Sequence, residues 1–176
     1  HSVELMPRLS QLLKLTKLEF KSISHIIVAR GPGSFNGLRV GLSCAKVLAF
    51  SLKIPLVGIS TLEAEAYQHA EIGLPVCSIL GAGRSEISAA IYQKKDNQWH
   101  QLSGEHITTV EALCSKITDK TIFCGQISPA IASQLEVNLK ELAVISSPPS
   151  RLRRAGFLAE LGLKRLKAGD FDHLAT

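Results

Sequence analysis

The chain has 176 residues, of which 45% are apolar and 20% are charged, and its formal net charge is +5. This composition is typical of a globular protein with a buried core and argues against a disordered chain. The mild positive charge permits an acidic partner such as RNA, although a solvated basic surface is the simpler interpretation.

Cysteine usage and hydropathy indicate the compartment. The four cysteines form no C-x-x-C pair, and three of them lie in apolar patterns, which favours free thiols in a reducing compartment over disulfides or a zinc site. No secretory signal is visible, and the longest apolar helical stretch, 38–52, contains Arg39 and Lys46, so it cannot span a bilayer. We predict a cytoplasmic protein with no membrane contact.

The first half of the chain predicts helices that alternate with buried strands. An amphipathic helix is expected over 2–17, because leucines recur there at helical spacing and Pro7 starts or kinks it. A strand over 24–29, a glycine-rich turn and a helix to residue 52 follow. A second strand over 55–60 and a helix over 61–70 complete this half. Because the chain begins at His1 inside a helical pattern, we expect it to be part of a longer protein.

The second half adds a hairpin to the same alternation. Strands are predicted over 76–80, 86–93 and 99–107, with turn chemistry at Asp96 and Asn97. A helix from 109, a strand over 121–124, a helix over 129–135 and a strand over 142–145 follow. The last helix covers 151–167 and is stopped by Gly169. The pattern predicts an α/β protein with parallel or mixed sheets. We expect a first lobe at 1–73, a second at 74–147, and a C-terminal helix at 148–176 that returns to the first lobe.

The run from Gly31 to Gly41 is the most informative stretch of the sequence. A strand, a glycine-rich turn and a helix start in this order can bind an anion or pack tightly. The run lacks the lysine and hydroxyl of a phosphate-binding P-loop, and its glycines do not match the dinucleotide fingerprint. Tight packing is therefore the stronger interpretation.

A stripe of small residues follows the turn on the predicted helix. Gly37, Gly41, Ala45 and Ala49 are spaced four apart, and such a stripe allows another helix to approach closely. A glycine inside a helix costs about 1 kcal/mol relative to alanine, so Gly41 needs a compensating contact. The stripe predicts packing against the first helix or against a partner chain.

No convincing catalytic group stands out. The aspartates lie in turn or tail contexts, and Glu86 is more simply a hairpin-edge residue than an acid or base. The histidines show no metal-binding spacing, and Ser34 lacks the pattern of a nucleophile elbow and suits a helix N-cap better. A basic cluster in the last helical segment can contact RNA phosphates, although a solvated helix end is the simpler view. Its candidate RNA contacts are Arg151, Arg153 and Arg154.

The run G-P-G-S-F-N-G-L-R-V-G at 31–41 resembles the TsaB (YeaZ) family, the partner subunit in bacterial threonylcarbamoyladenosine modification of tRNA. The family carries threonine where this chain has Asn36. The resemblance continues through 42–46 and 54–62, and the leucines of the first helix also fit. The second half matches less well, because the region 81–87 lacks the aspartate of the family's aspartate-alanine-arginine stretch.

The resemblance implies the two-lobe fold of the actin-like ATPase superfamily (ASKHA, ribonuclease H-like), here without the family's N-terminal strand meander. It implies a subunit that is not catalytic, has no cofactor of its own, and dimerises with a TsaD-like catalytic paralogue that uses ATP and a metal. Further implied partners are a TsaE-like ATPase, a second copy through the same helical face, and tRNA indirectly.

The interface in this family is formed by the first helix and the helix after the glycine-rich loop. Carried onto this sequence, the expected interface residues are Leu5, Leu9, Leu12, Gly31, Gly33, Ser34, Phe35, Gly37, Arg39, Gly41 and Ala45. The alternative functions are a nucleotide-binding ATPase or a metal-dependent peptidase of the glycoprotease family, which older labels suggest.

Overall fold

The computed structural model describes residues 2–148 and 153–172. Its internal contacts divide the chain into two compact units. Unit 1 contains residues 1–59 and 158–176, and unit 2 contains residues 60–157. The chain therefore leaves the first unit, forms the second, and returns.

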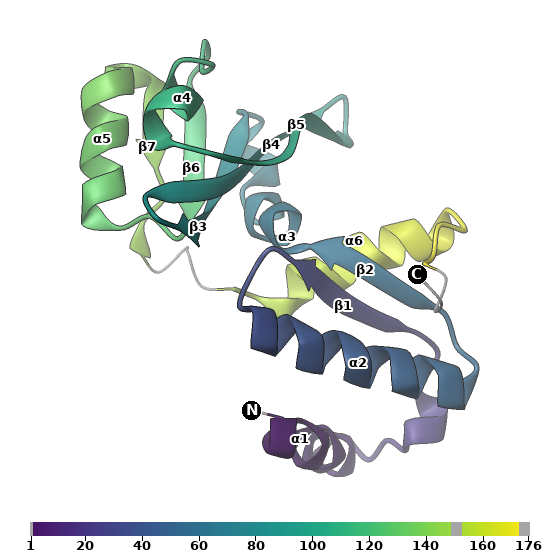
Figure 1. Cartoon of the computed structure of the whole chain (residues 1–176). Coiled ribbons are helices and arrows are strands. Elements are labelled where there is room, and N and C mark those ends of the chain that lie inside the picture. The colour runs from purple at the N-terminus through teal and green to yellow at the C-terminus, as the bar shows by residue number, and fades with distance from the viewer. Residues whose placement is uncertain (1, 149–152, 173–176) are drawn as a thin grey trace. The chain divides into compact units, whose positions relative to one another are not determined.

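Unit 1 is built around two hydrogen-bonded strands, β1 (Ile26–Gly31) and β2 (Leu56–Ser60). Helix α2 (Phe35–Leu52) connects them, helix α1 (Ser2–Leu15) precedes them, and helix α6 (Ala155–Lys167) enters the unit at Leu158. Pro7 lies inside α1. The expected helix–strand–helix–strand order of this region is confirmed (Figure 1).

Successive side chains of β1 point to opposite faces of the strand pair. On one face, Ile26 and Val28 pack with Ala45 and Ala49 of α2. On the other face, Ile27 lies against Gly162 of α6, where even a single added Cβ would be 2.5 Å from Ile27 Cγ2. Two helices thus cover the two faces of one short sheet (Figure 1).

The C-terminal segment is hydrogen-bonded to β2. The Asp172 amide donates to the Leu56 carbonyl (2.9 Å), and the Gly58 amide donates to Asp172 Oδ2 (2.6 Å). Arg165 of α6 donates to the Gly58 carbonyl (2.7 Å). These bonds satisfy backbone groups at the edge of β2 that would otherwise be unpaired.

Unit 2 holds a five-stranded sheet in the order β5-β4-β3-β6-β7. Strands β3 and β4 and strands β4 and β5 pair antiparallel, whereas β6 pairs parallel with both β3 and β7. The mixed sheet expected from the sequence is confirmed. The elements are α3 (Thr61–Tyr67), β3 (Val76–Gly83), β4 (Glu86–Lys95), β5 (Gln98–Thr108), α4 (Val110–Cys114), β6 (Thr121–Gly125), α5 (Pro129–Leu139) and β7 (Ala143–Ile145).

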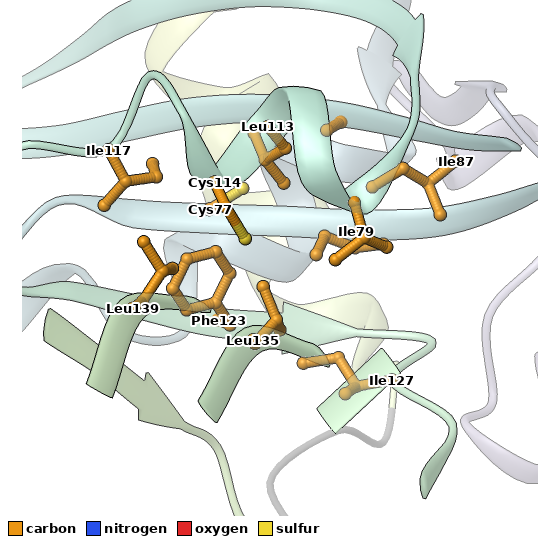
Figure 2. Packing of buried hydrophobic residues seen from close by; sticks show 12 residues of the cluster. Cys77, Ile79, Ile87, Leu113, Cys114, Ile117, Phe123, Ile127, Leu135 and Leu139 are labelled. Atoms are coloured by element: carbon orange, nitrogen blue, oxygen red, sulfur yellow. The ribbon is translucent and has the colours of Figure 1, made fainter. Parts of the chain in front are cut away.

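Each face of this sheet has its own apolar core. One cluster joins the sheet to α4 and α5 and is centred on Phe123, Leu113 and Leu135, all of which are fully buried (Figure 2). The other cluster joins the sheet to α3 through Leu62 and Ala66. The alternation of the strand side chains therefore supplies both cores at once.

The boundary between the units differs from the expected one at residue 73. Helix α3 packs on β3, β4 and β6, because Leu62 and Ala66 are buried beside Val76. Residues 60–73 therefore belong to unit 2, and so do residues 148–157, which we had placed with the C-terminal helix. That helix begins at Ala155 in the structure.

Local turn chemistry follows the sequence closely. Asp96 and Asn97 both adopt positive φ values, of 50° and 61°, in the turn between β4 and β5, as the hairpin prediction requires. Gly169 has a φ of 73° just after α6 ends. Among the described helices, none has the length and apolarity needed to cross a bilayer.

Candidate protein-interaction surface

The glycine-rich loop lies between β1 and α2 and is shaped by a packing contact. Gly31 is buried with a φ of 111°, and a Cβ there would be 3.1 Å from Leu38 Cδ1. A Cβ on Gly33 would lie 3.7 Å from the same Leu38 atom, so Gly33 also lies under this side chain. The first two glycines thus let the first turn of α2 fold back onto the loop. This geometry agrees with the packing interpretation of the run.

Ser34 occupies the N-cap position of α2, but its side chain forms no capping hydrogen bond. Only its carbonyl joins the helix, by accepting from the Leu38 amide (2.9 Å). The next residue, Phe35, is 75% exposed. Most of this large apolar side chain therefore lies in solvent.

Helix α2 presents an exposed apolar surface that the sequence analysis did not identify as a unit. Phe35, Val47 and Phe50 are 75%, 63% and 74% exposed, and Arg39 and Ser43 are exposed between them. These five residues recur every three or four positions and so form one stripe along the helix. We call this stripe the α2 outer face. Exposed apolar side chains that gather in this way mark interaction surfaces.

The stripe of small residues divides between two environments. Ala45 and Ala49 are 6% and 0% exposed and pack on the strands of unit 1. Gly37 is exposed, and a Cβ on Gly41 would meet nothing within 4 Å. A spacing of four residues turns by about 40° around a helix at each step, so the two ends of the stripe face different directions. The expectation of one helix-packing seam is therefore wrong for Ala49, whereas Gly41 and Ala45 also lie where α1 approaches α2.

A groove of about 400 Å³ runs between α1, β1 and α2. Leu5, Leu9 and Leu12 of α1 line one side of it, and Gly41 and Leu48 of α2 line the other. Cys44 Sγ lies 3.4 Å from Met6 Sδ and bridges the two helices. The structure thus places α1 beside α2, as one of the two sequence alternatives requires.

Apolar surface also remains on the outside of α1. Leu12 and Leu15 are 57% and 74% exposed, and Leu18, just beyond the helix, is 52% exposed. Together with the α2 outer face, they give unit 1 several large apolar side chains in solvent. Of the expected interface residues, only Gly31 and Ala45 are buried.

Part of the basic cluster near the C-terminus forms ion pairs within the chain. Arg153 donates to Glu65 Oε1 (2.5 Å), Lys164 pairs with Glu160 (3.2 Å), and Arg165 pairs with Asp170 (2.7 Å). Arg154 is exposed, and Arg151 lies outside the described residues. Intramolecular carboxylates therefore accompany part of the cluster, a pairing that the sequence analysis did not foresee.

The hydrogen bond between Arg165 and Asp170 lowers the pKa of the Asp170 carboxyl, an effect only partly opposed by desolvation. Burial acts on two other titratable groups. It lowers the pKa of His69 and raises the pKa of the Cys77 thiol, where Cys124 and Cys114 add to the effect. A thiol that resists ionisation is a poor nucleophile.

The residues considered as catalytic candidates do not form a cluster within the described parts of the chain. Glu86 is exposed at the start of β4, as expected for a hairpin edge. Within the described ranges, no three His, Cys, Asp or Glu residues gather closely enough to hold a metal ion. Cys77, Cys114 and Cys124 are buried free thiols, as predicted, and Cys44 is half-buried.

Glu65 is a buried polar group that the sequence analysis missed. Its side chain is 4% exposed, binds Arg153, and accepts a hydrogen bond from Ser78 (3.3 Å). The available signal was its position, three residues after Leu62 and one before Ala66 on the inward face of α3. A charged residue at an inward helical position requires a partner.

Solved structures show which fold this is. A Pseudomonas aeruginosa protein described as similar to peptidase YeaZ superimposes on this chain with a TM-score of 0.81 at 19% sequence identity. The match covers 100% of this chain and 81% of the Pseudomonas protein. YeaZ from the same organism superimposes with a TM-score of 0.79, and the match covers 98% of this chain and 80% of YeaZ. The chain therefore has the α/β fold of these YeaZ structures.

Sequence comparisons define the family more closely. The family model described as TsaD, tRNA N6-adenosine threonylcarbamoyltransferase, matches residues 1–143. The Bacillus subtilis tRNA threonylcarbamoyladenosine biosynthesis protein TsaB is 30% identical over 99% of this chain and 77% of its own length. The Escherichia coli TsaB is 29% identical over 61% of this chain, which spans 56% of that relative. The chain belongs to the TsaB family of tRNA threonylcarbamoyladenosine biosynthesis proteins.

Catalytic relatives also match. The tRNA N6-adenosine threonylcarbamoyltransferase of Syntrophus aciditrophicus is 49% identical over 63 residues, which make up 36% of this chain and 19% of that enzyme. The chain is therefore a relative of the transferases as well as a TsaB family member.

Proposed function

We propose that this protein is a non-catalytic partner subunit that pairs with a TsaD-type transferase during threonylcarbamoyladenosine formation in tRNA. The single observation that carries the proposal is the exposed apolar surface of unit 1. Five large apolar side chains of this unit lie in solvent, Phe35, Val47 and Phe50 on α2 and Leu12 and Leu15 on α1, and exposed apolar side chains that gather in this way mark interaction sites.

Relatedness between the two proteins supports a paired arrangement. A short segment of this chain is 49% identical to part of a transferase, so the two proteins share related elements. Related surfaces can associate about an approximate two-fold axis in the way that identical surfaces form isologous dimers. The same surface would serve a self-dimer of this chain when the transferase is absent.

The proposal assigns the chemistry to the partner. ATP and a metal are proposed to bind the transferase, a TsaE-type ATPase is a further proposed component, and tRNA is contacted indirectly, in the cytoplasm. The scattered catalytic candidates of this chain and the high pKa of the Cys77 thiol support this division.

The groove between α1 and α2 gives the pairing its proposed shape. Gly41 opens one wall of the groove, because nothing lies within 4 Å of its Cβ position, and a partner side chain could occupy that space. Arg39 supplies a positive charge within the α2 outer face, one turn after Phe35, and a carboxylate of the partner would orient the contact there.

Binding to a purified TsaD-type transferase tests the proposal. Size exclusion with light scattering should show a one-to-one complex, and calorimetry should show that Phe50→Ser weakens it by about 2 kcal/mol, or about 30-fold, as expected for a buried aromatic anchor. Val137→Ser is the matched control, because Val137 is 71% exposed on α5 of unit 2.

Two outcomes would overturn the proposal. Equal losses of affinity in the Phe50 and Val137 variants would show that the α2 outer face is not the interface. ATP turnover by this chain without the transferase would show that the subunit is itself an enzyme.

A further inference from the structure

Unit 2 contains a pocket of about 240 Å³ on the side of the sheet that carries α4. Pro75, Ile91, Leu113 and Ile117 form its apolar floor. Leu113 and Ile117 belong to the core cluster on this face (Figure 2). Ile91 packs against that cluster. Because Pro75 directly precedes β3, the pocket lies where the parallel strands begin, and none of its residues belongs to the surface proposed above.

An irregularity in β5 brings two polar side chains into this pocket. Ala89 pairs with His106 and Ile91 pairs with Ser103, so two steps along β4 are matched by three along β5. In a regular strand, Ser103 and His106 would face opposite sides, because residues three apart alternate. The extra residue places both of them on the pocket wall. Bulges that redirect side chains in this way are common beside functional sites.

Hydrogen bonding defines what these two side chains can offer. The Nδ1 atom of His106 lies 2.8 Å from the Gly104 carbonyl oxygen. A carbonyl only accepts, so in the neutral ring Nδ1 carries the hydrogen and Nε2 is an acceptor. Nε2 is buried and has no partner in the described parts of the chain. The Ser103 hydroxyl also has no hydrogen-bond partner among the described residues and can both donate and accept.

The charges at the pocket cancel. Lys116 and Asp119 both line it, and Asp119 Oδ2 accepts a hydrogen bond from the Thr118 hydroxyl (3.1 Å). One cation and one anion favour neither a cationic nor an anionic ligand. Size gives a second limit, because a cavity of about 150 Å³ holds benzene, so this pocket accommodates one substituted ring.

We propose that this pocket binds a small uncharged aromatic compound with a hydroxyl group, a phenol in the simplest case. The ring lies on the apolar floor, and the hydroxyl accepts from Ser103 and donates to His106 Nε2. Because Nε2 is covered in the structure, the imidazole has to tilt toward the pocket to receive this hydrogen bond. Binding would then give a partner to a buried acceptor whose isolation is unfavourable.

An NMR titration of the ¹⁵N-labelled chain with phenol and with toluene tests the proposal. The two compounds have the same shape, and toluene is the more apolar, so a purely apolar pocket would prefer toluene. We expect saturable shifts centred on Ser103, His106 and Leu113, with half-saturation at about 1 mM for phenol. The two proposed hydrogen bonds, partly offset by the more favourable burial of the toluene methyl group, should make phenol bind about fivefold more tightly than toluene.

Three variants separate the proposed contacts from general effects. His106→Leu and Ser103→Ala should each abolish the preference for phenol, whereas His100→Leu should retain it, because His100 is exposed on the same strand and does not line the pocket. Spectra without ligand identify any variant that fails to fold, and Ser103→Ala, the smallest change, remains decisive if His106→Leu does so.

The proposal is overturned if wild-type protein binds toluene as well as phenol, or if shifts do not saturate by about 10 mM. It is also overturned if the shifts lie outside the pocket. Each of these results would leave the proposed pairing with the transferase untouched, because that pairing is measured on unit 1.

Discussion

Gly125 at the end of β6 is a position where both the backbone conformation and the surrounding atoms require glycine. Its φ is 92°, a conformation that L-residues with a Cβ rarely adopt. A Cβ there would overlap the carbonyl oxygen of Ile79 on β3 and lie 2.7 Å from Glu65 Oε2. That carbonyl is held in place because it accepts a hydrogen bond from the Gln126 amide (2.8 Å). We therefore expect Gly125→Ala to be strongly destabilising.

Two terms determine the size of the effect. The left-handed backbone costs an alanine about 1–2 kcal/mol, and forcing an extra methyl group into a packed site costs about 1–3 kcal/mol. The lower entropy of the unfolded alanine chain returns about 0.5 kcal/mol. The net loss should be about 3 kcal/mol, which lowers the urea midpoint by about 1.5 M when the slope is about 2 kcal/mol/M.

Trp99 gives an assay that reports on unit 2. It is the only tryptophan of the chain, and it contacts Tyr67 and Tyr92 with ring centroids 5.3 and 5.6 Å apart. Its fluorescence during urea unfolding therefore follows the unit that contains Gly125. Gly73→Ala is the matched control, because Gly73 has a φ of 78° but nothing within 4 Å of its Cβ position.

The control isolates the steric term from the backbone term. Gly73→Ala should cost only about 1 kcal/mol, so the difference of about 2 kcal/mol measures the collision at Gly125. If the two variants lose the same stability, the collision between β6 and β3 does not exist, and the close approach inferred from the structure is refuted.

Three further predictions concern other parts of the chain. Gly162→Ala should lower the thermal stability of unit 1 by about 1–2 kcal/mol in circular dichroism, and Ile27→Ala in the same chain should relieve part of that loss; strictly additive losses would contradict the packing. Arg165→Gln should raise the pKa of Asp170 in an NMR titration, because Arg165 holds that pKa below its usual value. The stabilisation from this ion pair is therefore present above about pH 4 and disappears as the pH falls through the folded-state pKa. An unchanged pKa of Asp170 in the variant would contradict the ion pair. A thiol reagent should label Cys44 first in the native chain, and equally fast labelling of all four cysteines would argue against the buried core.

The helices and strands were largely predictable because their signals are local. Apolar periodicity located β1, α2 and β2, and the Asp96–Asn97 turn located the hairpin. The boundary at residue 73 failed because a break in the sequence pattern does not show which sheet a helix covers. Helix α3 follows β2 directly but buries Leu62 and Ala66 against the other sheet, and only the tertiary contacts reveal that choice.

Contacts between distant residues were beyond the reach of sequence patterns. Arg153 and Glu65 are 88 positions apart, so the interpretation of Arg153 as part of a free basic cluster had no local evidence against it. The irregular pairing of β5 is a similar case, since Ser103 and His106 acquire a common side only through their register with β4. Such features depend on which strands pair, not on the residues in one strand.

Helix α2 explains why its interaction surface was only half predictable. Small residues were visible as a stripe, but small residues serve equally well for packing on a strand or on another helix. Ala45 and Ala49 turn toward the sheet, and the apolar side chains that remain in solvent, Phe35 and Phe50, lie elsewhere on the helix. A helix that must cover a sheet and bind a partner has to place apolar residues on two sides, so its hydrophobic pattern loses the clear single face from which a surface could be deduced.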